Sequence, residues 1–403
     1  MHALKAARCF DGERFLPGGT TVLLDGERIA GVEPLAYDAP DGVAVTTYDG
    51  TLLPGLVDAH VHLVSEGRLP SEPGSLEHAA RLDDAGLDSV IARTLATQAA
   101  AGVTTVRDLG DRAYRTLAAR DRRTDGEPRI VAAGPPLTIP DGHCHFLGGG
   151  VAGVDAVRAA VREHVDRGVD LVKVMASGGM LTIGSDLLGV QFTPEELHAA
   201  VEETHEAGLR VVAHCHSLAG ARHAVAAGVD GLEHATLLGP DGIAVPDDLI
   251  DEIAVRGLTV DPTLGYDPAR VIPLDQAPPH VRAVVARVGM TPVEVTHRRA
   301  AQLARMFERG VRVVSGLDSG AAPPKPHGDL WRAVVQLLDA GVTSAQALAT
   351  ATSAAADDCG LRATTGRLAP GLSADLLVVD GDLERDLTAL SRPRAVWVRG
   401  VPV

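Results

Sequence analysis

Six residues spread along this 403-residue chain have side chains that can bind metal ions or move protons. They are His60, His62, Lys173, His214, His234 and Asp318. His60 and His62 close the stretch TLLPGLVDAHVH. On a β-strand, residues i and i+2 point to the same face, so both imidazoles would project the same way from the end of a buried strand. Two nitrogen ligands could then reach one metal ion, although an isolated H-x-H pair is also common without a metal.

The other four residues fall at the ends of further apolar runs. Lys173 lies in DLVKVMAS, where a buried ammonium ion would be costly, and His214 ends VVAH. His234 ends DGLEH, and Asp318 follows VVSG. Each has a structural alternative: a hydrogen-bonded core histidine, an aspartate that caps a turn, or a lysine that reaches the surface. Their joint placement at strand ends favours a metal site.

The middle of the chain repeats a pattern in which a small residue or Arg precedes Gly and a short apolar run. The six repeats are AGVTTV at Ala101, RGVDLVKV at Arg167, AGLRVVAH at Ala207, AGVDGLEH at Ala227, RGLTVDPT at Arg256 and RGVRVVSG at Arg309. Each Gly suits the left-handed end of a helix, and each run suits a buried strand. Helix starts are marked by Thr-Pro-Xaa-Glu at Thr193 and again at Thr291.

With further strands at 56–60 and 129–133, the count reaches eight strands that alternate with helices. This predicts an α/β fold, a (β/α)8 barrel over residues 55–364. A doubly wound open sheet is the alternative, but it does not explain why ligand-type residues recur at strand ends. Residues 1–54 and 365–403 contain short β-rich runs and Gly turns, which predict one small sheet built from both ends of the chain.

Composition excludes several classes of partner. Lys and Arg total 37 against 53 Asp and Glu, and the net charge of -16 disfavours nucleic acid and anionic membranes. The four cysteines have no paired spacing, and the sequence shows no signal peptide and no apolar run of transmembrane length. We therefore expect a cytoplasmic protein that acts on a small molecule.

These motifs together resemble the amidohydrolase superfamily, metal-dependent hydrolases with a (β/α)8 barrel and a small β-sandwich. The resemblance rests on LPGLVDAHVH, VKVMASGG, AHCHS, GLEHA, GLDSG and GRLAPGLSADLLVVDGD. It implies that His60 and His62 bind the more buried of two metals and that His214 and His234 bind the second. It also implies that Lys173 bridges both as a carbamate formed with carbon dioxide, and that Asp318 binds the first metal and shuttles a proton.

This ligand set implies hydrolysis of an amide-type C–N bond. Imidazoles and oxygen donors suit two Zn²⁺ ions, while Mn²⁺ or Co²⁺ fit the same shell. A water shared by two such metals is acidified to a hydroxide that adds to the scissile carbonyl, and Asp318 would pass its proton to the leaving nitrogen.

Within the superfamily, the chain most resembles imidazolonepropionase-like proteins and Xaa-Pro dipeptidases, through the stretch from Lys173 to Leu197. Lys173 counts against imidazolonepropionase activity, because that enzyme resembles a mononuclear site without the bridging lysine. We expect an N-acyl amino acid or a dipeptide as substrate. The alternatives are a carbamate, urea or cyclic-amide hydrolase, a deaminase on the same site, and an inactive scaffold of this fold.

Candidate substrate contacts lie in loops after the strands: His143, His145, His216, Tyr266 and His327. Lys325, in a proline-rich loop, is expected to face solvent. No helix pattern specifies a self-complementary interface, although homo-oligomers are frequent in the families that the chain resembles.

Overall fold

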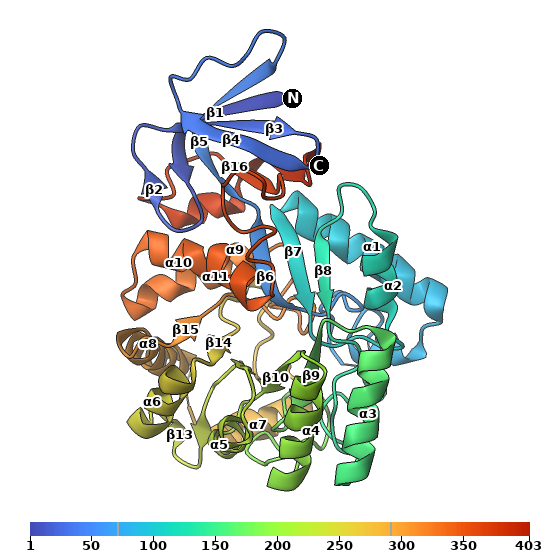
Figure 1. Cartoon of the computed structure of the whole chain (residues 1–403). Helices are drawn as coiled ribbons and strands as arrows, with labels where there is room; N and C mark the ends of the chain where they lie inside the picture. The colour runs from blue at the N-terminus through green and yellow to red at the C-terminus, as the bar shows by residue number, and fades with distance from the viewer. Residues whose placement is uncertain (71, 291) are drawn as a thin grey trace.

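The computed structural model describes residues 1–70, 72–290 and 292–403. Strands from both ends of the chain share one eight-stranded sheet, ordered β18-β17-β16-β5-β1-β3-β4 with β2 paired to β1 (Figure 1). Its strands are β1 His2–Phe10, β2 Phe15–Leu16, β3 Thr20–Asp25, β4 Arg28–Pro34, β5 Ala44–Pro54, β16 Leu376–Val379, β17 Pro393–Val398 and β18 Val401–Pro402. β16 runs antiparallel to β5, which joins the two ends of the chain in this sheet.

The terminal sheet has a hydrophobic cluster of its own. Leu4, Val22, Leu52, Leu376 and Trp397 belong to this cluster, which is separate from the main core. The terminal strands form one connected sheet, and the expected β-sandwich is not confirmed. The division into domains at residues 54 and 365 stays a prediction.

All eight strands expected in the middle of the chain are present, and they form two parallel sheets. One sheet has the order β15-β14-β11-β10-β9 and the other β6-β7-β8. Their bounds are β6 Leu56–Val61, β7 Val103–Asp108, β8 Arg129–Ala132, β9 Leu171–Met175, β10 Arg210–His214, β11 Gly231–Glu233, β14 Thr259–Asp261 and β15 Arg312–Val313. A closed ladder of eight strands is not seen among the described residues, so the α/β class is confirmed without the closed barrel.

The two parallel sheets meet through isolated parallel bridges, Leu137 with Val174 on one side and Val61 with Ser319 on the other. A short hairpin, β12 Leu238–Gly239 with β13 Gly242–Ile243, follows β11. At the close approach of the sheets, a Cβ on Gly316 would collide with His60 and Asp261, so this position requires glycine.

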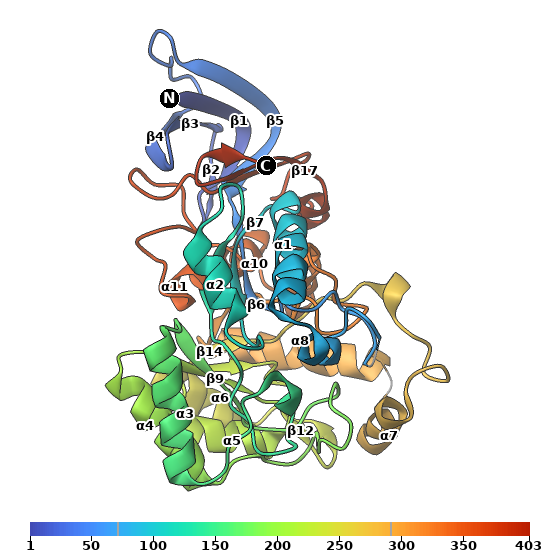
Figure 2. The same cartoon turned by 90° about the vertical axis from the view of Figure 1, so that its right-hand side faces the viewer.

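Helices surround the parallel strands, and the terminal sheet lies beyond one end of them (Figures 1 and 2). They are α1 Asp84–Ala100, α2 Arg115–Arg122, α3 Val154–Arg167, α4 Pro194–Glu206, α5 Leu218–Ala227, α6 Asp247–Arg256, α7 Pro279–Val288, α8 Pro292–Glu308, α9 Leu330–Gln336, α10 Ser344–Thr350 and α11 Ser353–Asp358. Short 3-10 helices cover Glu77–Arg81, His145–Leu147, Pro268–Arg270, Leu337–Ala340 and Leu387–Ser391. In the described part of the chain, no helix is long and apolar enough to cross a membrane.

The local signals explain several of these ends. Thr193 and Glu196 form the expected capping box at the start of α4, whereas Thr291 lies outside the described residues. α3, α5 and α6 end at left-handed glycines, Gly168, Gly228 and Gly257. The strands β9, β11 and β14 thus start shortly after a helix ends, and their parallel pairing with β10 and with one another brings the carboxyl ends to a common edge.

Candidate metal centre

The six expected ligand residues lie together at the carboxyl ends of the parallel strands. They line one cavity of about 480 Å³. Together with His216, these residues form what we call the polar floor of the cavity: His60, His62, Lys173, His214, His216, His234 and Asp318. Two sets of metal-ligating atoms occur within it, one from His60, His62 and Asp318 and the other from His214, His216 and His234.

The first set is organised around Asp318. Its Oδ1 lies 3.5 Å from Nε2 of His60 and 3.2 Å from Nε2 of His62. On the other side of each ring, Nδ1 of His60 is 2.8 Å from Glu233 Oε2, and Nδ1 of His62 is 3.3 Å from the carbonyl oxygen of Gly110. Since Nδ1–H donates to these acceptors, the lone pair of each Nε2 is directed at the cavity, as a metal ligand requires.

The second set is held in the same manner. Nδ1 of His234 lies 2.8 Å from Thr263 Oγ1 and Nδ1 of His216 lies 2.9 Å from Thr236 Oγ1, while Nε2 of His214 lies 3.2 Å from the carbonyl oxygen of Gly178. One nitrogen of each ring therefore remains available. The ring centroids of His216 and His234 are 4.4 Å apart, which places His216 among the candidate ligands as well as among the candidate substrate contacts.

Lys173 is 1% exposed, and its Nζ has no hydrogen-bond partner in the described residues. Burial lowers the pKa of Lys173, against the opposing effect of Glu233 and Asp318. Burial likewise lowers the pKa of His60, His214 and His234 well below the ordinary value. Neutral imidazoles and a neutral amine are the forms that bind metals and react with carbon dioxide, so the residues present fit a two-metal site with a modified lysine.

Backbone strain occurs at two of the candidate ligands. Asp318 has φ 62° and His234 has φ 64°, in the left-handed region that non-glycine residues rarely adopt. Such strain is retained when surrounding contacts hold it, and it concentrates at functional sites. At His234, Arg299 donates to the carbonyl oxygens of His234, Ala235 and Pro262 at 2.7 to 2.8 Å.

A charged network beneath the polar floor was not expected from the sequence. Arg107 is buried and pairs with Asp358 at 2.7 Å and with Glu233 at 3.1 Å, and Glu233 holds His60. The sequence does contain a signal for this network, because Arg107 lies inside the apolar run of TTVRDLG and a buried arginine must be paired. Asp58 shares a face with His60 and His62, and it accepts from Leu317 N at 3.0 Å, which joins β6 to the loop of Asp318.

The remaining expected contacts divide into two groups. His143, His216 and Tyr266 line the cavity, and Tyr266 is 45% exposed there. His145 and His327 are not among the described residues that line it. His145 bonds to the carbonyl oxygen of Gly142 through Nδ1, at 2.9 Å. Nε2 of His327 donates to the carbonyl oxygen of Ser65 at 2.8 Å.

The expectation for Lys325 was wrong. Its Nζ donates to the carbonyl oxygens of Thr263, Gly265 and Leu317 at 2.7, 3.2 and 2.9 Å, so it ties the loop after β14 to its own loop after β15 at the cavity. An ammonium ion has three donors, and carbonyl groups satisfy all of them. The surrounding prolines suggested exposure, and sequence alone did not show that three loop carbonyls converge on this position.

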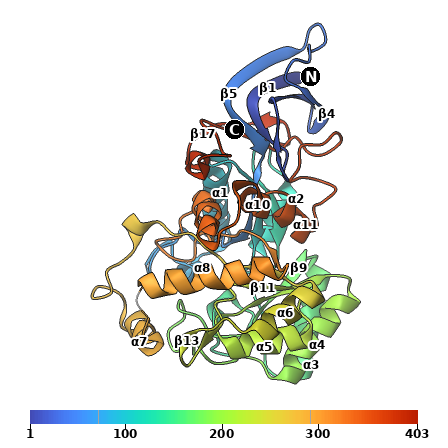
Figure 3. The same ribbon diagram turned by 90° about the vertical axis from the view of Figure 1, so that its left-hand side faces the viewer.

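The same cavity also has an apolar wall. It consists of Met180, Leu187, Leu238, Ile243, Val284, Val288 and Met290. Val284 and Val288 belong to α7, which is set apart from the other helices (Figures 2 and 3). Val284 and Val288 are half-buried and pack against the cluster of Leu187, Leu238 and Ile243, so part of their surface stays open to what enters the cavity.

Comparison with known proteins gives one family and several relatives. The profile of the amidohydrolase family matches residues 51–403. An uncharacterized protein of Mycobacterium tuberculosis is 31% identical over 399 residues, covering 96% of this chain and 93% of that protein. Ochratoxinase of Aspergillus niger is 26% identical over 374 residues, covering 86% of this chain and 73% of the other.

Similar solved structures agree with the family match. A Xaa-Pro dipeptidase with bound methionine has a TM-score of 0.87 and 25% identity, covering 100% of this chain and 99% of that one. A prolidase complexed with N-methylphosphonate-L-proline has a TM-score of 0.81 and 26% identity, with the same coverage of 100% and 99%.

Proposed function

Since the chain belongs to the amidohydrolase family and is a hydrolytic enzyme acting on C–N bonds, we propose that it is a two-metal hydrolase of small amides. The favoured substrate is an N-acyl amino acid or a dipeptide with a large apolar group. The observation that carries this proposal is the complete polar floor around the unpartnered Nζ of Lys173 in one cavity. The apolar wall is the reason why we expect an apolar group on the substrate.

In this proposal, each set of ligating atoms would hold one divalent cation. His60, His62 and Asp318 would hold the first, and His214 and His234 would hold the second, with His216 within reach of the same position. Lys173, as a carbamate, would complete the ligand set. Bound cations of this kind would acidify a water molecule and polarise the scissile carbonyl. Zn²⁺ is the favoured metal because most of the ligands are imidazoles.

Asp318 is proposed to move the proton. Its Oδ1 faces both histidines of the first set, and its side chain is 13% exposed, so a substrate can reach it. The carboxylate takes the proton of the attacking water and delivers it to the leaving nitrogen. The apolar wall orients the substrate and excludes water from the reacting bond.

We further propose that the two parallel sheets act as one (β/α)8 barrel with the terminal sheet as a second domain. The parallel bridges at Leu137 and Val61 support this arrangement. It would explain why residues from five different strands or strand ends meet on one floor.

The test is a substrate screen of the zinc-loaded enzyme with dipeptides, N-acyl amino acids, lactams, carbamates and ureas. We expect the highest kcat/KM for amides with a bulky apolar group, two equivalents of metal by elemental analysis, and a carbamate carbon signal by NMR after incubation with ¹³C-labelled bicarbonate. Lys173→Ala should lose that signal and most of the activity, whereas Lys5→Ala, in the terminal sheet, should retain both.

Two results would contradict the proposal. Less than about one equivalent of metal together with full activity of Lys173→Ala would remove the two-metal mechanism. One equivalent of metal with an unmodified lysine would favour a mononuclear deaminase or cyclic-amide hydrolase instead.

A further inference from the structure

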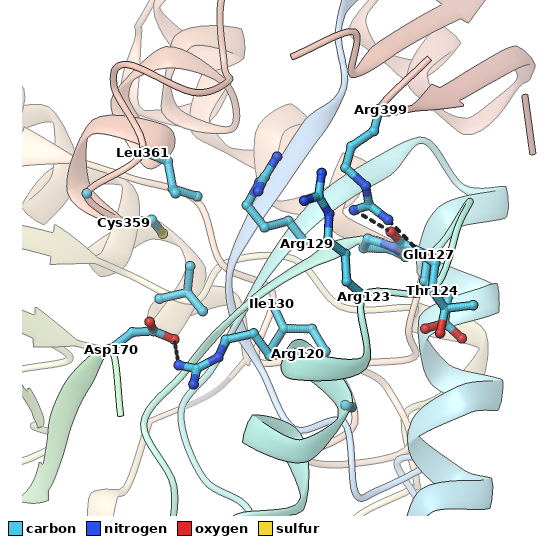
Figure 4. Close-up of a pocket in the computed structure, with 14 residues that line it drawn as sticks. Arg120, Arg123, Thr124, Glu127, Arg129, Ile130, Asp170, Cys359, Leu361 and Arg399 are labelled. Atoms are coloured by element: carbon cyan, nitrogen blue, oxygen red, sulfur yellow. Dashed lines mark hydrogen bonds and ion pairs between the residues drawn. The ribbon is translucent and has the colours of Figure 1, made fainter. Parts of the chain in front are cut away.

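A second cavity, of about 430 Å³, lies at the opposite end of the parallel strands from the polar floor. Arg129, the first residue of β8, and Asp170, which precedes β9, line it. Leu361, beyond α11, and Arg399, between β17 and β18, complete the enclosure (Figure 4). Its volume falls within the range of small-molecule sites, about 300 to 1,000 Å³.

The lining of this cavity is basic although the chain as a whole is acidic. Four arginines, Arg120, Arg123, Arg129 and Arg399, face two carboxylates, Glu127 and Asp170. The net charge of the chain is -16, so such a concentration of positive charge is exceptional in it. Figure 4 shows the guanidinium groups of Arg123, Arg129 and Arg399 gathered on one side, while Arg120 turns toward Asp170.

Three of the four arginines have partners. Arg399 donates to the carbonyl oxygens of Thr124 and Glu127 at 2.7 and 3.2 Å. Arg120 pairs with Asp170 at 2.8 Å. Arg123 pairs with Glu27 at 2.5 Å, and its side chain is 61% exposed.

Arg129 has no such partner. No hydrogen bond or ion pair joins its side chain to another described residue, and its Nε is buried. Burial lowers the pKa of Arg129, the charge of Asp375 raises it, Arg399 and Arg123 lower it, and Glu27 raises it. A largely buried guanidinium beside two other cations, without a hydrogen-bonded carboxylate, is stabilised by a further anion.

The rest of the lining is apolar. Ile130, Val131 and Leu361 present aliphatic side chains, and Cys359 lies beside them. Burial raises the pKa of Cys359 to about 12, so its thiol adds no negative charge at neutral pH. The cavity thus combines cationic donors on one side with an apolar surface on the other.

We propose that this cavity is a binding site for a small organic anion, a carboxylate or a phosphate ester with an apolar body. The acidic group pairs with the guanidinium groups of Arg129 and Arg123, whose planar donors match two oxygens of either acid. The apolar body lies against Ile130 and Leu361. This site is separate from the polar floor and does not depend on the proposed reaction.

The test uses the full-length, metal-loaded protein and isothermal titration calorimetry with three probes: phenyl phosphate, benzoate and neutral benzamide. We expect saturable binding of at least one acidic probe and none of benzamide. The acid that binds more tightly identifies the ligand as a phosphate ester or a carboxylate. Binding should weaken about 10- to 100-fold in Arg129→Gln, which loses charge-assisted hydrogen bonds.

Two further variants keep this result interpretable. Arg123→Gln changes an exposed residue, so it should fold normally and still weaken binding several-fold. Arg394→Gln changes an exposed arginine of β17 outside the cavity and should bind like wild type. Two results would overturn the proposal. One is that benzamide binds as tightly as the acidic probes. The other is that both Arg129→Gln and Arg123→Gln leave the affinity for the acidic probes unchanged, because the probes would then bind elsewhere, for example at the metal centre.

Discussion

The polar floor of the active-site cavity consists of residues on strands or just after them, whereas most of the apolar wall comes from helices, loops and a short hairpin. Each candidate histidine ligand on the floor has a partner that fixes its ring, such as Glu233 for His60 or Thr263 for His234. On the wall, Val284 and Val288 stand on a helix without buried side chains. From this difference we propose that the floor is the more rigid part and carries the reaction, while the wall selects the substrate.

The largest effect should follow from a change on the floor. Asp318→Asn removes both a ligand atom and the proposed proton carrier, so kcat/KM should fall about 10³-fold or more. Steady-state kinetics against a bulky N-acyl amino acid measures this. Asp339→Asn, at an exposed position on the neighbouring 3-10 helix, is the matched control and should act like wild type. A loss below tenfold for Asp318→Asn would show that the floor does not carry the chemistry.

A smaller but still large effect should follow beneath the floor. Arg107→Met leaves Glu233 and Asp358 buried without their shared partner, which should lower the free energy of unfolding by about 3 to 5 kcal/mol. Zinc affinity should fall about 10- to 100-fold because Glu233 no longer holds His60 firmly. Urea denaturation and metal competition measure the two quantities.

The control for that change is Arg222→Met, which breaks an exposed pair with Asp248 and should cost at most about 1 kcal/mol. If Arg107→Met were no more harmful than this control, the charged network would not be what makes the floor rigid.

The same comparison explains what sequence could predict. The floor could be predicted from the sequence because strand ends in a parallel α/β fold converge, so His60, Lys173, His214, His234 and Asp318 could be grouped by position alone. The strands themselves could be predicted from the repeated Gly and apolar runs. Asp58 and Arg107 could have been found too, since each is a charged residue inside an apolar run.

The wall and the loops were much harder to predict from the sequence. Which residues of α7 face the cavity depends on how the segment between β14 and α8 returns to the body, and no local rule determines that. Lys325 shows the same limit: its ammonium group is held by two carbonyl groups of the loop after β14 and one of its own loop. The terminal sheet was predicted because short β-rich runs and Gly turns occur at both ends of the chain, whereas the expected β-sandwich is not confirmed.

His327 belongs to neither the floor nor the wall, and its protonation can be tested through the stability of the protein. Burial lowers the pKa of His327 to about 4, and Ser65 opposes this. Nε2–H donates to Ser65, so Nδ1 is the acceptor for Gln98 Nε2 at 3.2 Å, and protonation would put a donor against that amide. Since the unfolded chain takes up this proton near pH 6.5, stability is fully present above pH 6.5 and is lost as pH falls toward 4.

We therefore expect the free energy of unfolding to fall by up to about 3 kcal/mol more in wild type than in His327→Gln between pH 6.5 and 4. Denaturant titrations of both proteins across this range measure the difference. Parallel pH profiles would mean that the imidazole is not held in its neutral form, and a direct role at the cavity would then regain support.

The smallest effect should come from the wall, and it separates the wall from the floor most clearly. Val284→Ala with Val288→Ala removes four methyl groups that would contact a bulky substrate, so KM should rise about tenfold while kcat stays within about twofold. The reason is that these valines contact the substrate away from the reacting bond, and such contacts stabilise the ground state and the transition state equally. Val255→Ala, at a valine that is 87% exposed on α6, is the matched control. If kcat fell instead and KM stayed constant, α7 would act in the transition state, and the wall would share the catalytic role assigned to the floor.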